Sequence, residues 1–170
     1  MTSQFASHAK AAWHLHKRNR DGAEAEYRTI LARSPADPPS LHFVLGTLRW
    51  KGKDEEALAL AREALAVEPA NFIALRNAAC CAVALGRHQE AEAFVENALR
   101  AADHEPEGYR WIDTFLLAAW RFARLVKRSS TEAPIPEPPF AKADRELISW
   151  KEWARSYLES REAAKGRSPQ

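Results

Sequence analysis

The stretch DEEALALAREALAVEP, residues 54–69, places alanine at almost every third or fourth position. That spacing is the period of one face of a helix. A small helical protein usually has leucine on such a face, because large apolar side chains supply most of the burial. Alanine instead lets two helix backbones approach closely. The stretch therefore predicts a helix that packs tightly between its neighbours.

The alanine pattern repeats along the chain. Ala23, Ala57 and Ala91 are separated by intervals of 34 residues. Further sets keep the interval: Tyr27, Ala61 and Val95; Ile30, Ala64 and Ala98; Pro35, Pro69 and Asp103. A period of this length indicates one supersecondary unit per repeat, and such units stack because a single helix pair cannot bury its apolar face alone.

Residues typical of helix ends recur with the repeat. Asn19, Gly52 and Gly86 are residue types that take a left-handed conformation, so we expect them to end the first helix of each unit. Asp21 and Asp54 follow, and we expect them to cap the second helix. Each unit is thus predicted to be a helix, a tight turn and a second helix.

Three segments carry a resemblance to a known family. The segment LGTLRWKGKDEEALALAREALAVEPAN, residues 45–71, has a Leu-Gly pair in its first helix, a small residue opening its second, and a terminal proline. Residues 75–103 match nearly as well, whereas residues 4–37 lack the Leu-Gly pair. The chain resembles a tetratricopeptide-repeat (TPR) protein. The resemblance implies an all-α, right-handed superhelix of about three units, residues 4–37, 38–71 and 72–105.

The resemblance also implies a binding surface. In the family, a concave groove is lined mainly by the first helix of each unit. Matching those positions residue by residue gives Trp13, His16, Phe43, Thr47, Trp50, Arg76, Asn77, Cys80 and Val83.

This predicted groove is largely apolar and aromatic, which fits an extended peptide with apolar anchors. Some family members bind acidic chaperone tails through lysines, arginines and asparagines, but only Arg76 and Asn77 stand near such positions here. The alternative interpretation is that Phe43 and Trp50 are packing residues between helices.

The rest of the chain has its own organisation. Residues 106–128 are predicted to form a capping helix with apolar residues on two faces, and residues 129–141 a proline-rich connector. Residues 142–164 are predicted to form an amphipathic helix with an aromatic stripe. Three arrangements are open for that stripe: it packs on the capping helix, it exchanges between two copies in a homodimer, or it occupies the groove of its own chain.

Composition excludes several function classes. The 25 basic and 23 acidic residues are mixed along the chain and give a net charge of +2, so nucleic acid is disfavoured as a partner. We see no apolar run long enough for a signal peptide or a membrane span, and we expect a cytoplasmic protein with no membrane partner. Cys80 and Cys81 are consecutive on a predicted helix, where their side chains diverge by about 100°, so we expect reduced thiols.

The sequence shows no evident catalytic, metal-binding or phosphate-binding motif. His14 and His16 diverge by about 200° on a helix, which does not suit a shared metal ion. The six glycines are well separated and form no phosphate-binding loop. We therefore expect no metal, no cofactor and no enzymatic activity.

The sequence favours a non-catalytic adaptor or chaperone that holds a segment of another protein in the groove. The alternative is a structural protein that self-assembles through its aromatic C-terminal helices. A third hypothesis, an accessory subunit of an enzyme, differs only in the identity of the partner.

Overall fold

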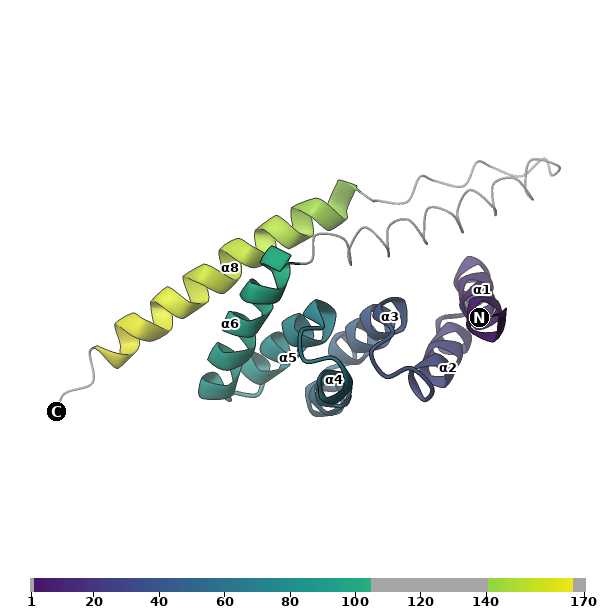
Figure 1. Ribbon diagram of the computed structural model, residues 1–170, viewed down its shortest axis with the longest axis horizontal. Helices are drawn as coiled ribbons and strands as arrows, with labels where there is room; N and C mark the ends of the chain where they lie inside the picture. The colour runs from purple at the N-terminus through teal and green to yellow at the C-terminus, as the bar shows by residue number, and fades with distance from the viewer. Residues whose placement is uncertain (1, 105–140, 167–170) are drawn as a thin grey trace. The chain divides into compact units, whose positions relative to one another are not determined.

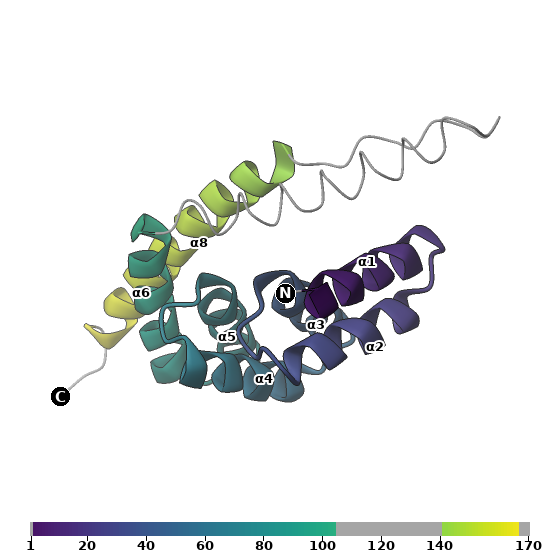
Figure 2. The same cartoon turned by 45° about the vertical axis from the view of Figure 1, so that its right-hand side comes forward.

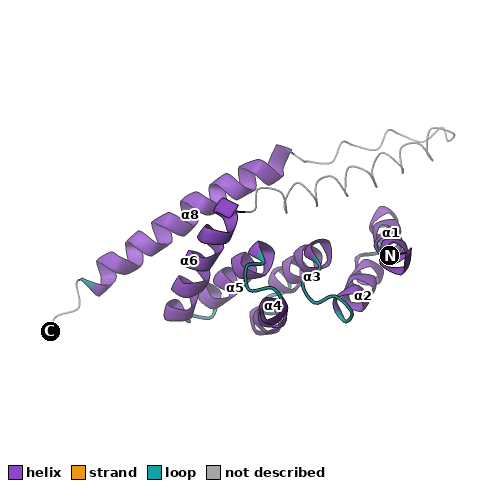
Figure 3. Ribbon diagram, viewed as in Figure 1, coloured by secondary structure: helices purple, strands orange, loops and turns teal. Residues whose placement is uncertain are grey.

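The computed structural model describes residues 2–104 and 141–166 (Figure 1). These residues form helices and contain no strand (Figure 3). The all-α prediction is therefore confirmed for the described chain. The expected capping helix, residues 106–128, and the connector up to residue 140 lie outside it.

Six helices make up the compact unit Met1–Glu105. They are α1 (Thr2–His16), α2 (Arg20–Leu31), α3 (Pro38–Trp50), α4 (Asp54–Val67), α5 (Phe72–Ala84) and α6 (His88–His104). Each odd-numbered helix packs on the helix that follows it, and α3 also contacts α2 and α5. In Figure 2, the run of helices begins with α1 and α2 side by side at one end. The unit boundaries and the handedness of the superhelix stay predictions.

The turn inside each helix pair has one repeated geometry. Arg18, Gly52 and Gly86 have φ values of 58°, 69° and 71°. The residue after each donates its backbone N–H to a carbonyl five residues earlier, and these hydrogen bonds measure 2.9, 2.9 and 2.8 Å. The pattern is a left-handed ending of the first helix that satisfies its last carbonyls.

The glycine predictions are correct, but Asn19 is not the left-handed residue of the first turn. Arg18 is, because it stands 34 residues before Gly52. Asn19 is instead the N-cap of α2, and its side chain accepts a 2.9 Å hydrogen bond from the N–H of Gly22. The repeat interval, rather than residue type, decides which residue takes the left-handed conformation.

The predicted N-caps are also displaced by one or two residues. Asp21 lies inside the first turn of α2, and α4 begins at Asp54 with Lys53 at the cap and no side-chain capping bond. The left-handed turn is so tight that the second helix starts two residues after it. The two carboxylates still lie at positively polarised helix N-termini, where negative charge is favourable.

Small residues form the joints between helices. Ala23, Ala57 and Ala91 are completely buried, as are Ala64 and Ala98. The larger fully buried side chains are Leu41, Val44, Leu45, Leu48, Leu58 and Val95. The alanines therefore lie where helices meet, and the leucines of α3 and α4 fill the space beside them.

The described part of the second unit is a single long helix, α8 (Ala141–Lys165). Trp150 and Ala154 on this helix are buried, whereas Trp153 is 38% exposed. The Trp153 ring stacks on that of Tyr157 with centroids 5.6 Å apart. The three arrangements of the aromatic stripe stay predictions.

Candidate partner-binding face

The helix α3 presents an exposed tryptophan at its end. Trp50 is 80% exposed, and its ring lies 5.9 Å from the Cζ of Arg20 on α2. Gly46, one turn earlier on the same side, is exposed and has no neighbour within 4 Å of a Cβ built on it. This side of α3 is open to a ligand.

Phe43 and Thr47 are less accessible. Phe43 is half-buried, and its ring centroid lies 4.9 Å from that of Tyr27 on α2. Thr47 is only 6% exposed. Phe43 therefore takes part in packing between helices, whereas Trp50 is exposed to solvent.

On α5, the candidates divide in a similar way. Arg76, Cys80 and Val83 are partly exposed. Asn77 is buried: it accepts a 3.2 Å hydrogen bond from Nη1 of Arg49 on α3, and its Nδ2 donates to the carbonyl of Ile73 at 2.8 Å. Its side-chain oxygen therefore joins α5 to α3, whereas its Nδ2 is bonded within α5.

On α1, Trp13 and His16 are both exposed, with ring centroids 5.6 Å apart. The Nζ of Lys17 lies 4.9 Å from the centre of the Trp13 ring, a cation–π geometry. Sequence reasoning missed Lys17 and Arg20 as companions of the two tryptophans. The signal was present, since both lie in the basic run KRNR, residues 17–20.

Comparing equivalent positions of the 34-residue repeat shows a difference between His16 and Trp13. His16 and Trp50 are equivalent positions, and both are exposed. Trp13 is equivalent to Thr47 and Cys81, which are buried. Trp13 is therefore exposed because α1 is the first described helix, with no described helix pair packed before it.

A buried polar cluster joins α1 to the start of α3. Nε2 of His8 is 3.2 Å from Oδ1 of Asp37, and the Ser40 hydroxyl donates to Oδ2 at 2.5 Å. Burial alone would raise the pKa of the Asp37 carboxyl, but the hydrogen bonds from His8 and Ser40 hold it below its usual value. Burial, together with the Asp37 charge, raises the pKa of Tyr27 to about 12.

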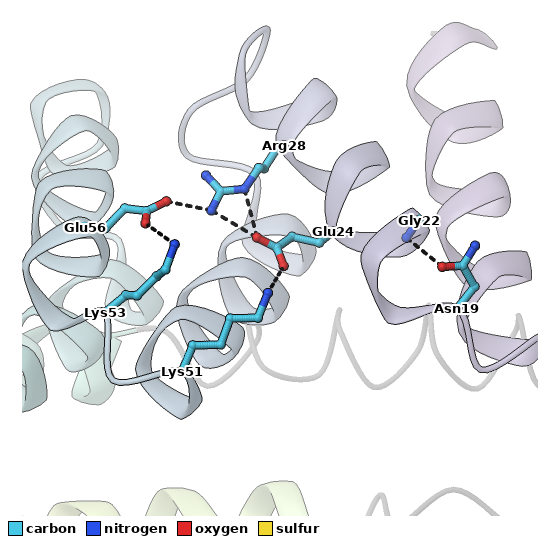
Figure 4. A network of polar contacts seen from close by, with 7 residues as sticks. All are labelled: Asn19, Gly22, Glu24, Arg28, Lys51, Lys53 and Glu56. Atoms are coloured by element: carbon cyan, nitrogen blue, oxygen red, sulfur yellow. Dashed lines mark hydrogen bonds and ion pairs between the residues drawn. The ribbon is translucent and has the colours of Figure 1, made fainter.

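A network of ion pairs joins α2, the end of α3 and the start of α4 (Figure 4). Glu24 accepts from Arg28 at 3.0 Å and from Lys51 at 2.9 Å. Arg28 also donates to Glu56 at 2.8 Å, and Lys53 lies 3.2 Å from the same carboxylate. The hydrogen bond from Lys51, despite the opposing effect of burial, is the main reason that the pKa of Glu24 is lowered.

The ion pairs follow the repeat. Arg28 pairs with Glu56, and 34 residues later Arg62 pairs with Glu90. Both pairs join second helices of successive units. These helices present a charged, mutually paired face to solvent, whereas within residues 2–104 the exposed tryptophans Trp13 and Trp50 lie on first helices.

Other kinds of site are not formed by the described residues. Within residues 2–104 and 141–166, no three His, Cys, Asp or Glu side chains gather as they would around a metal ion. None of the described helices is both long and apolar enough to span a bilayer. An open depression at the α5–α6 turn is lined by residues 86–90, and no predicted groove residue lines it.

Two solved structures are similar to this chain. The Sgt2 TPR domain from Aspergillus fumigatus is 16% identical, and the match covers 81% of this chain and 89% of that one with a TM-score of 0.51. The TPR2B domain of yeast Sti1, in a complex with pHsp70, is 17% identical, with coverages of 71% and 98% and a TM-score of 0.52. The chain has a TPR fold. This finding confirms the resemblance indicated by the 34-residue interval.

No family model matches the sequence, and no curated protein matches it. The TPR fold is thus visible in the three-dimensional arrangement of the helices and in the spacing of small residues. It places α1, α3 and α5 as the first helices of successive pairs, and these helices carry the exposed aromatic candidates.

Proposed function

We propose that this protein is a non-catalytic interaction module that holds an extended segment of a partner protein against α3 and α5. The observation that carries the proposal is Trp50 on α3, a large aromatic side chain that is 80% exposed. On α5, which packs on α3, Arg76, Cys80 and Val83 are partly exposed. Aromatic and arginine side chains are the usual anchors of protein interfaces.

The chemistry of this face supports an apolar segment with some polar character. Trp50 and Val83 offer apolar contact, Arg20 lies by the Trp50 ring, and Arg76 is a partly exposed cation on α5. Asn77 and Thr47, predicted as groove residues, are largely buried, so in this proposal they support the face from beneath. His16, the equivalent of Trp50 on α1, is exposed as well and belongs to this face in the proposal.

The test is quantitative affinity capture from a cell extract with the full chain. We expect Trp50→Ala and Arg76→Ala to reduce capture of a specific protein at least about fivefold, in line with anchor residues worth more than 1 kcal/mol. The matched control is Val67→Ala, because Val67 is a 63% exposed apolar residue on α4 outside this face. Capture that survives both substitutions, or that is lost equally with Val67→Ala, excludes α3 and α5 as the binding face.

A second candidate function is self-assembly through α8. It is favoured by the 38% exposure of Trp153 and its stacking on Tyr157, since exposed aromatic pairs are common at interfaces. Light scattering of the purified chain distinguishes the two functions. A mass that grows with concentration and falls on Trp153→Ala supports assembly, whereas a constant small mass supports the interaction module.

A further inference from the structure

We propose that one face of α1, formed by Ala6, Ala9 and Trp13, binds an acidic amphipathic helix of a partner protein. We call this surface the α1 end face. It is separate from the face of α3 and α5, and it is identified by comparing equivalent positions of the three helix pairs.

The comparison shows one helix face that is buried on α3 and α5 and exposed to solvent on α1. Ala6, Lys10 and Trp13 are exposed, Trp13 to 56%, although the Lys10 ammonium group is paired with Glu26 of α2 at 2.5 Å. The equivalent positions in the next two units are all buried: Ser40, Val44 and Thr47 on α3, and Ala74, Ala78 and Cys81 on α5.

In the later units, the preceding helix pair covers this face. Phe43, equivalent to Ala9, packs its ring on Tyr27 of α2. Asn77, which is also equivalent to Ala9, accepts a hydrogen bond from Arg49 of α3. The structure therefore contains two examples of what packs against such a face, and both are helices. Among residues 2–104, no helix covers the same face of α1.

Charge indicates the partner's chemistry. Lys51, at the end of α3, pairs with Glu24 of the preceding α2 at 2.9 Å. Lys17 is its equivalent on α1, and no carboxylate among the described side chains lies within ion-pair distance of it. Its Nζ lies over the Trp13 ring instead. A helix seated on α1 as α2 is seated on α3 would place a carboxylate beside Lys17.

The remaining residues fit a helix as the occupant. Ala6 and Ala9 allow a close approach of two helix backbones. Trp13 supplies a large apolar anchor at the end of the face, next to Lys17. The expected partner is a helix with an apolar stripe and a glutamate or aspartate near the end that meets Lys17.

The probe is a labelled synthetic peptide of residues 20–31, the α2 sequence RDGAEAEYRTIL, held helical by a side-chain staple. Its binding to the full chain is followed by fluorescence polarisation. We expect saturable binding that weakens at least tenfold with Trp13→Ala and with Lys17→Glu. Val67→Ala is the matched control, since Val67 is 63% exposed on α4 outside both proposed faces, and it should change the affinity less than twofold.

A charge exchange tests the register. A peptide carrying Glu24→Lys should bind the unaltered chain at least tenfold more weakly and regain affinity for the Lys17→Glu chain. If Lys51→Glu restores binding instead, the peptide has displaced the chain's own α2, and the proposal is wrong.

Two further results overturn it. One is the absence of saturable binding of the peptide, or binding that Trp13→Ala leaves unchanged. The other is a dimer in sedimentation velocity that Trp13→Ala dissociates, which assigns the face to a second copy. Neither result bears on the face of α3 and α5, whose test depends on Trp50 and Arg76.

Discussion

Nε2 of His8 lies 3.2 Å from Oδ1 of Asp37, and both side chains are almost completely buried. The contact joins the first helix to the N-cap residue of the third, across 29 positions of sequence. Asp37 is also tied to Ser40 through both its side-chain hydroxyl and its backbone N–H. This one carboxylate therefore caps α3 and fixes α1 against it.

Removing either partner should destabilise the fold, because the other side chain stays buried and loses a hydrogen bond between the two helices. We expect His8→Ala to lower the free energy of unfolding by about 3 kcal/mol and Asp37→Ala by more, since the latter also removes a helix cap. Urea unfolding of both variants and of the double variant measures the coupling. A loss below about 1 kcal/mol for each would mean that the contact contributes little.

The same carboxylate should make stability sensitive to acid. Its pKa is lowered in the folded protein from an ordinary value of 3.8, so its stabilisation is fully present above that value and is lost as the pH falls towards the folded pKa. Asp37→Asn should therefore cost less stability below about pH 4 than at pH 7. Unfolding curves at both pH values for the two chains provide the measurement. An unchanged difference would contradict the assignment.

Replacing Arg18 with glycine should increase the stability of the protein. Its φ of 58° is unfavourable for a residue with a Cβ, and the equivalent positions in the other two turns hold glycine. We expect Arg18→Gly to stabilise the protein by about 0.5–1 kcal/mol despite the greater entropy of the unfolded chain. Gly52→Ala is the counterpart, with a predicted loss of about 1 kcal/mol from backbone strain alone, since no atom lies near its Cβ position. Thermal unfolding distinguishes the signs of the two effects.

The buried alanines at the helix contacts should not tolerate larger side chains. Ala57 is fully buried, so Ala57→Leu is expected to overpack the joint and cost about 1–3 kcal/mol. Ala59 lies on the exposed side of the same helix, and Ala59→Leu should change stability by less than about 0.5 kcal/mol. Both substitutions keep a strong helix former, which leaves packing as the difference between them. Equal losses in chemical denaturation would refute the role given to Ala57.

The two cysteines should differ in reactivity. Burial, followed by smaller effects of Asp54 and Cys80, raises the pKa of the Cys81 thiol to about 12 although the Arg49 charge opposes the change. Cys80 is partly exposed. In a Cys80→Ala chain, Cys81 should react with a thiol reagent at least about tenfold more slowly than Cys80 does in a Cys81→Ala chain, because the thiolate is the reactive form. Denaturation should remove the difference, and similar rates in the folded chains would contradict the burial of Cys81.

Much of the fold was predictable from one interval in the sequence. Small residues 34 positions apart, at Ala23, Ala57 and Ala91, indicated helix pairs that pack closely, and Gly52 and Gly86 marked where two of the first helices end. These features are local: an alanine pattern sets how near two backbones can come, and a glycine permits a left-handed turn whatever surrounds it.

Only the tertiary structure decided which side chains are accessible. Trp13 and Thr47 occupy the same position of the repeat, yet Trp13 is exposed and Thr47 is buried. Asn77 was a plausible ligand contact in sequence, but Arg49 of another helix engages its side-chain oxygen. Burial and hydrogen bonding depend on what the neighbouring helices place against a residue, and a residue's position within its own repeat does not carry that information.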